Sequence, residues 1–139
     1  MTMRRPTIEG FFTAIKSNKV DHLKSIFDEN IIFKAPTYWK GWRGKEFVPR
    51  ILSHVGWVFN KLEYKRVLCN GSEYFLEFSC NIGYLDATGV DMISLNSKGL
   101  IETFEVVMRP YKSVGELRNS INLLTSNYSF FAGLRETND

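Results

Sequence analysis

The sequence is poor in the residues and patterns that mark metal sites, export and membrane insertion. It has two cysteines and two histidines in 139 residues, and neither type is clustered at zinc-ligand spacing, so we expect no metal site and no cofactor. No apolar run approaches the roughly 18 residues of a membrane-spanning helix. The basic start, Met-Thr-Met-Arg-Arg-Pro, is not followed by the apolar core of an export signal. We therefore expect a soluble, cytoplasmic protein without a membrane partner.

The two cysteines are not placed to form a disulfide. Cys69 and Cys80 lie on two predicted strands joined by Asn70-Gly71, which puts Cys80 about five residue pairs from the turn beside Cys69. Free thiols fit a reducing compartment.

Positive charge exceeds negative charge only slightly, and it is scattered. The formal net charge is +3, whereas phosphate binding needs basic residues gathered on one face. The segment 38–45 does interleave aromatic and basic side chains, as single-strand nucleic-acid platforms do. Its glycines at 41 and 44 favour instead a mobile loop that closes over a cavity mouth. We expect no nucleic-acid partner.

What the sequence has is an ordinary globular composition with many large apolar side chains. Hydrophobic residues make up 44% and aromatic residues 14% of the chain, enough for one core and the wall of a pocket. We expect a single domain over residues 1–139, with frayed ends at 1–6 and 135–139.

Apolar residues at helical spacing predict four helices. The first is expected after an N-cap at Thr7 and ends near Ser17, and the second follows a capping box of Asn18 and Asp21 and runs to about Glu29. The third covers 47–59 with Pro49 in its first turn. The fourth starts from an S-x-x-E capping box at 113–116 and carries Val114, Leu117, Ile121 and Leu124.

Alternating apolar residues predict the strands. A short strand at 31–33 stops before Pro36, and a meander follows with strands at 62–69, 74–82, 90–95 and 100–110. We expect turns at Asn70-Gly71, at 83–89 and at Asn96-Ser97-Lys98-Gly99. The apolar tail residues Tyr128, Phe130, Phe131 and Leu134 need a partner surface, in their own subunit or another.

Asp91 breaks the pattern of the last hairpin. It shares a strand face with Ile93 and Leu95, where apolar core is expected. A buried carboxylate must take up a proton, find a partner or line a cavity. We interpret Asp91 as a candidate general acid or hydrogen-bond donor to a ligand carbonyl. The alternative is a structural carboxylate bonded to a tyrosine, a histidine or backbone donors.

Three helices interleaved with a first strand and followed by a four-strand meander resemble the nuclear transport factor 2-like superfamily. The segments that carry the resemblance are Asn18-Lys19-Val20-Asp21, Ile31 to Pro36, Gly41-Trp42-Arg43-Gly44-Lys45-Glu46, and Val90-Asp91 followed by Gly99 and Ile101. Their order resembles the SnoaL-like branch, related to polyketide cyclases and ketosteroid isomerase. The resemblance implies an α+β, cone-shaped fold, with helices packed in the concave face of a curved, mostly antiparallel sheet, and a homodimer through that sheet.

The ketosteroid isomerase pattern fits this sequence only in part. The resemblance places Asp91 at the position of the acid that an apolar site keeps protonated for the substrate oxyanion. The general base, however, would fall at Ala35, and the tyrosine donor at about Phe11. Neither residue transfers protons, so we exclude steroid isomerisation by that mechanism and expect no more than acid-assisted chemistry at Asp91.

Further candidate residues come from strand alternation, the third helix and the aromatic loop. His54, on the edge of the third helix's apolar stripe, is a weak candidate base. An inward Glu105 would need a partner such as Arg66. The candidate pocket walls, which core packing explains equally well, are Tyr38, Trp39, Trp42, Trp57, Leu76, Phe78, Cys80, Phe104, Val106 and Met108.

Three functions remain open at this point. The first is an isomerase, lyase or cyclase that uses Asp91 on a small, largely apolar molecule bearing an oxygen. The second is a module that binds such a molecule without chemistry. The third is protein interaction through the sheet or the apolar tail, with the cavity filled by side chains.

Overall fold

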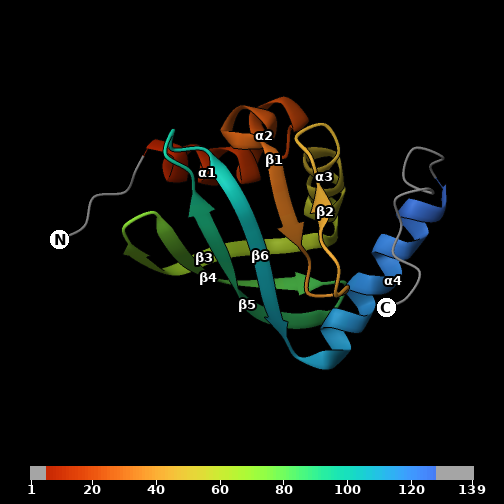
Figure 1. Ribbon diagram of the computed structural model, residues 1–139. Coiled ribbons are helices and arrows are strands. Elements are labelled where there is room, and N and C mark those ends of the chain that lie inside the picture. The colour runs from red at the N-terminus through yellow and green to blue at the C-terminus, as the bar shows by residue number, and fades with distance from the viewer. Residues whose placement is uncertain (1–5, 128–139) are drawn as a thin grey trace.

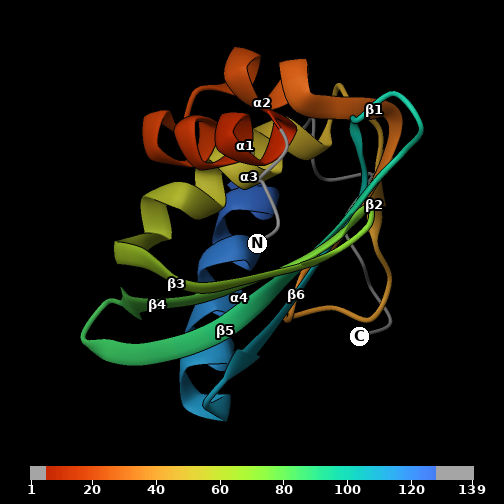
Figure 2. The same cartoon turned by 90° about the vertical axis from the view of Figure 1, so that its left-hand side faces the viewer.

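A curved sheet that partly encloses the helices defines the architecture of the computed structural model, which describes residues 6–127. Helices α1 to α3 lie together over one side of the sheet, and α4 lies at the end away from α1 (Figures 1 and 2). The helices are α1 (Pro6–Ser17), α2 (Val20–Ile26), α3 (Val48–Val58) and α4 (Tyr111–Asn127). The strands are β1 (Phe27–Lys34), β2 (Trp42–Arg43), β3 (Phe59–Asn70), β4 (Glu73–Ile82), β5 (Leu85–Leu95) and β6 (Ile101–Arg109).

The sheet confirms the predicted fold class. Its strand order is β2-β1-β6-β5-β4-β3, and the only parallel pair among the described strands is β1 with β6. The meander β3 to β6 is antiparallel throughout, as the alternating sequence predicted. Strand β2, inside the predicted loop, was missed because two residues are too few to show alternation.

The predicted helix caps are wrong because each capping side chain has another partner. Helix α1 already includes Thr7, whose hydroxyl donates a hydrogen bond to the carbonyl of Gly99. Asn18 has a left-handed backbone, with φ of 56°, and its amide donates to the Ser53 carbonyl at 2.8 Å. Ser113 lies inside α4, and its hydroxyl donates to the Asp86 carbonyl at 2.6 Å.

Two predicted boundaries also shift. Helix α2 ends at Ile26, and Phe27 to Asn30 belong to β1 because this stretch joins the sheet beside β6. The turn after β4 is two residues long, Gly83 and Tyr84, where the sequence predicted seven. Pro49 lies in the first turn of α3, as predicted.

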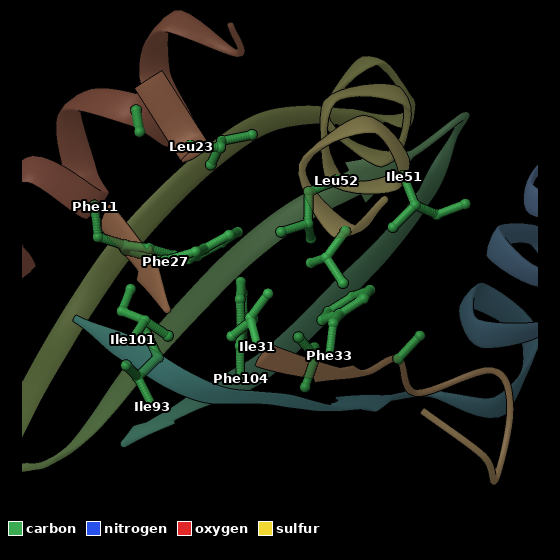
Figure 3. Close-up of a cluster of buried hydrophobic side chains, with 14 of the residues drawn as sticks. Phe11, Leu23, Phe27, Ile31, Phe33, Ile51, Leu52, Ile93, Ile101 and Phe104 are labelled. Carbon is green, nitrogen blue, oxygen red and sulfur yellow. The ribbon is translucent and has the colours of Figure 1, made fainter. Parts of the chain in front are cut away.

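The core fills the concave side of the sheet. Its centre contains Phe11 of α1, Leu23 of α2, Ile51 and Leu52 of α3, and Phe27, Ile31, Phe33, Ile93, Ile101 and Phe104 of the strands. In Figure 3 the side chains from the helices and those from the strands point toward one another. Burial alternates strictly along β4, with Tyr74, Leu76, Phe78, Cys80 and Ile82 facing inward.

The hairpin β5–β6 has the predicted turn. Gly99 has a φ of 80°, and the Asn96 side chain accepts hydrogen bonds from the backbone N–H groups of Lys98 and Leu100, at 2.9 and 3.0 Å. The pairing of β5 with its two neighbours places Asp91 opposite Leu76 of β4 and Val106 of β6.

The tail residues Tyr128, Phe130, Phe131 and Leu134 lie outside the described residues. Within residues 6–127, no helix is long and apolar enough to cross a membrane, and no three potential ligands come together to hold a metal ion. Cys69 and Cys80 are both free.

Candidate functional site

A cavity of about 930 Å³ lies between the helices and the concave side of the sheet. Much of its wall is aromatic, with contributions from α1, α3 and four strands, and Asp91 of β5 also lines it. The aromatic lining residues are Phe12, Phe33, Trp57, Phe59, Tyr64, Phe78 and Phe104. The cavity is large enough for a molecule of the size of a small drug or a cofactor.

Asp91 is the buried acid of this cavity. Its residue is 3% exposed, and it faces inward together with Ile93 and Leu95, as the strand period predicted. One carboxylate oxygen accepts a hydrogen bond of 2.7 Å from the hydroxyl of Tyr64 on β3. No Lys or Arg among the described residues forms an ion pair with it. The cost of burying this carboxyl group is therefore offset by one neutral hydrogen-bond donor and by protonation.

Burial governs the protonation of this pair. Loss of solvent raises the pKa of the Asp91 carboxyl from 3.8 to about 7, although the hydrogen bond from Tyr64 lowers it in part. Burial and the neighbouring Asp91 charge raise the pKa of the Tyr64 hydroxyl well above 10. The same causes raise the pKa of the Cys80 thiol to about 11. Near neutral pH, Tyr64 and Cys80 are neutral and Asp91 exists in both forms.

Aromatic rings hold Tyr64 in place. Its ring centroid lies 5.1 Å from that of Phe12, 6.2 Å from that of Phe11 and 6.3 Å from that of Phe78. Sequence reasoning did not select Tyr64, although alternation along β3 puts it on the same face as Leu62. A tyrosine on the inward face of β3, two strands from the inward aspartate of β5, is the signal that could have identified it.

Replacing Tyr64 with phenylalanine should raise the pKa of Asp91 further. The substitution keeps the ring but removes the only described side-chain donor to the carboxylate, and this donor favours the ionised form. Carbon-13 NMR titration of the Asp91 carboxyl measures the change, with Tyr84→Phe as the control because Tyr84 is fully exposed. An unchanged or lower Asp91 pKa in Tyr64→Phe would contradict the proposed role of this bond.

The structure divides the predicted pocket residues into three groups. Trp57, Phe78, Phe104 and Val106 line the cavity together with Asp91. Tyr38, Trp39 and Met108 line a separate cleft of about 720 Å³ beside β1 and β6, which Val106 also reaches. Trp42, Leu76 and Cys80 are buried in the core and line neither of these two spaces.

The aromatic loop does not cover the Asp91 cavity, because it is attached elsewhere. The Arg118 guanidinium of α4 lies 4.6 Å from the centroid of the Tyr38 ring and donates to the Thr37 carbonyl at 2.9 Å. Trp42 stacks on Phe33, with ring centroids 5.9 Å apart. The loop residues that line a space, Tyr38 to Gly41 and Arg43, line the separate cleft.

His54 does not line the cavity, and Arg66 has another partner than Glu105. On α3 the side facing the cavity carries Leu52, Val55 and Gly56, and His54 is half-buried outside that stripe. The Arg66 guanidinium pairs with the carboxylate of Glu77, with two bonds of 2.7 Å, so it is not the partner of Glu105. Glu105 lines the separate cleft.

Comparison with solved structures places this geometry in a known class of proteins. An uncharacterized bacterial protein with a cystatin-like fold from Silicibacter pomeroyi is 41% identical, with a TM-score of 0.88 over 92% of this chain and 91% of that one. A steroid delta-isomerase from Pseudomonas aeruginosa is 28% identical, with a TM-score of 0.83 over 88% and 90% of the two chains. A nuclear transport factor 2-like protein of unknown function from Cytophaga hutchinsonii, 18% identical with a TM-score of 0.62 over 81% and 97%, shares the fold.

No protein-family model and no curated protein matches the chain. The structural similarities nevertheless agree with the sequence resemblance. The chain belongs to the same family as the Silicibacter pomeroyi protein, and its fold is that of nuclear transport factor 2-like proteins.

Proposed function

We propose that this protein binds a small, largely apolar molecule that bears an oxygen, and that Asp91 acts on that oxygen as an acid in isomerase, lyase or cyclase chemistry. The observation that carries the proposal is a buried carboxyl group with a raised pKa that lines a cavity of about 930 Å³. The similarity to a steroid delta-isomerase supports it.

The protonated form of Asp91 can donate a hydrogen bond to a ligand, which the apolar side chains of the cavity cannot do. A ligand carbonyl placed against this O–H gains stabilisation as negative charge develops on its oxygen, and the dry surroundings strengthen that interaction. The Tyr64 hydroxyl holds the other carboxyl oxygen and so orients the acid. Tyr64 is thus a positioning residue in this proposal.

The cavity favours reactions that need an acid more than reactions that need a strong second base. Besides Asp91, the ionisable residues that line it within residues 6–127 are Lys16, Lys19 and Tyr64. Ala35 is also a lining residue, at the position where the isomerase pattern would have its base. Acid-assisted elimination, ring closure or epoxide opening fits this set, and binding without turnover is the second candidate function.

Turnover should depend on Asp91. With a panel of cyclic ketones, enones and epoxides, we expect Asp91→Asn to lower kcat/KM for an active substrate by about 10²-fold or more. We expect the wild-type rate to fall as pH rises through about 7, since the acid loses its proton there. Asp86→Asn is the matched control, because Asp86 is exposed on the same strand.

The outcomes separate the two candidate functions. Ligand binding that weakens in Asp91→Asn, with no turnover in the wild type, would favour the binding module. A substrate that is turned over equally by wild type and Asp91→Asn would remove Asp91 from the mechanism.

The outer face of the sheet supports a homodimer, which we propose on the basis of exposed apolar side chains. Leu68 is 66% exposed, Phe75 47% and Val107 45%. Leu68 pairs with Phe75, and Phe75 pairs with Met92. The side chains of Leu68, Phe75 and Met92 therefore form a row across β3, β4 and β5. Such a patch on a sheet is typical of a protein interface.

The two free thiols support a cytoplasmic location.

A further inference from the structure

We propose that the ligand of the Asp91 cavity is an amphiphile: an apolar body with an oxygen at the Asp91 end and a negatively charged group at the other end, where Lys16 and Lys19 hold it. This inference rests on the proposed function, since it assumes that the cavity takes a ligand. It adds the charge and the orientation of that ligand.

The exposed lining residues locate the mouth of the cavity. Of the lining residues that the structure describes, only Lys16, Lys19, Gly56 and Trp57 are exposed. They come from the C-terminal ends of α1 and α3 and from the link between α1 and α2, and we call them the rim. Asp91, Phe78, Phe104 and Val106 are buried, as are the lining residues Leu117 and Ile121 of α4. A ligand therefore enters past two lysines and ends near the acid.

The rim carries positive charge that can bind a negatively charged group of a ligand. Among the described residues, neither the Lys16 nor the Lys19 ammonium lies within ion-pairing distance of a carboxylate. Asp91 is the only carboxylate that lines the cavity within residues 6–127, and it lies at the buried end. The C-termini of α1 and α3 contribute partial negative charge of about half a unit each, which two full positive charges exceed.

The backbone around the rim is held by specific contacts. The Asn18 amide donates to the Ser53 carbonyl at 2.8 Å, and the Ser53 hydroxyl donates back to the Asn18 carbonyl at 3.0 Å. A Cβ at Gly56 would lie 2.2 Å from the Asn18 amide oxygen, so the Asn18 side chain packs directly against α3 at this glycine. The link that carries Lys16 and Lys19 is thereby fixed against α3.

The distribution of polarity along the cavity completes the argument. Apolar and aromatic side chains make up most of the wall between the rim and Asp91, among them Phe12, Ile15 and Leu62. A neutral apolar ligand would need no charge at the entrance, whereas an amphiphile matches the rim, the wall and the acid in turn. Lysine ammonium groups bind carboxylates as point charges with little demand on geometry.

The test uses a matched pair of probes, 6-acetyl-2-naphthoate and its methyl ester, which share the ketone and the ring and differ in charge. Isothermal titration calorimetry gives the ratio of the acid's affinity to the ester's affinity. We expect this ratio to fall about 5- to 10-fold in the double variant Lys16→Gln/Lys19→Gln, the effect of losing two solvent-exposed ionic contacts. The ester's own affinity should change less than about 2-fold, and added salt should lower the wild-type ratio.

The control is Lys65→Gln/Lys98→Gln, which removes the same charge from exposed lysines outside the cavity lining and should leave the ratio unchanged. An unchanged ratio in the rim variant, with the ester still bound, would overturn this inference and leave the proposed function standing. Equal falls in the rim and control variants would also overturn it, because net charge alone would then explain the effect. If neither probe binds the wild type, the proposed function fails and the inference fails with it.

Discussion

Asp91→Asn is expected to be more stable than the wild type at pH 8, by about 4 kcal/mol in free energy of unfolding. Folding raises the pKa of this carboxyl from 3.8 to about 7, a shift of about 3 units at 1.36 kcal/mol each. Because the folded-state pKa is the higher one, the folded protein binds the proton more tightly. The stabilisation from Asp91 is complete below about pH 3.8 and is lost as pH rises to about 7. Asparagine avoids this loss because it does not ionise.

Urea denaturation at a series of pH values between 4.5 and 8 measures this effect. The wild type should lose stability relative to Asp91→Asn across this interval, while Asp86→Asn, on the same strand but exposed, should follow the wild type. Parallel stability curves for wild type and Asp91→Asn would mean that Asp91 has an ordinary pKa in the folded protein.

Phe11→Ala is expected to lower the free energy of unfolding by about 3 to 5 kcal/mol, the usual loss for a buried phenylalanine. Phe11 is 0% exposed. Its ring centroid lies 5.3 Å from that of Phe104 and 6.2 Å from those of Phe12 and Tyr64. The substitution leaves a cavity where α1 meets the sheet, and it removes one of the rings that hold Tyr64 against Asp91.

Denaturant midpoints at constant pH measure the loss. The matched control is Tyr84→Ala, where the aromatic side chain is fully exposed, and we expect its loss to be much smaller. A loss below about 1 kcal/mol for Phe11→Ala would show that the core repacks around the gap.

These two results would separate the role of the site from the role of the core. Phe11 stabilises the fold, whereas the ionised form of Asp91 destabilises it. An acid kept in an apolar cavity at a cost in stability is typical of a site that serves function. Higher stability together with lost activity in Asp91→Asn is therefore the combination that our proposal requires.

Local pattern was sufficient for the meander and for the placement of Asp91. Alternation along β4 and β5 and the Asn96 to Gly99 turn depend on neighbouring residues only, so the register that turns Asp91 inward could be predicted. Local pattern did not show whether the side chains of Asn18 and Ser113 cap their helices. Their side chains instead bond carbonyl groups of Ser53 and Asp86, which are distant in sequence.

The sequence by itself determined the helices and strands, the strand faces and the presence of one inward acid, since these follow from periodicity, and its resemblance to a known family implied the class of fold. Only the tertiary structure decided what surrounds that acid. It brought Tyr64 to Asp91 across two strand pairings, attached the aromatic loop to α4 through Arg118, and placed Lys16 and Lys19 at the mouth. The physical reason is that a site is built from contacts between distant segments. These contacts depend on how the curved sheet and the helices pack, and a local sequence pattern does not encode that packing.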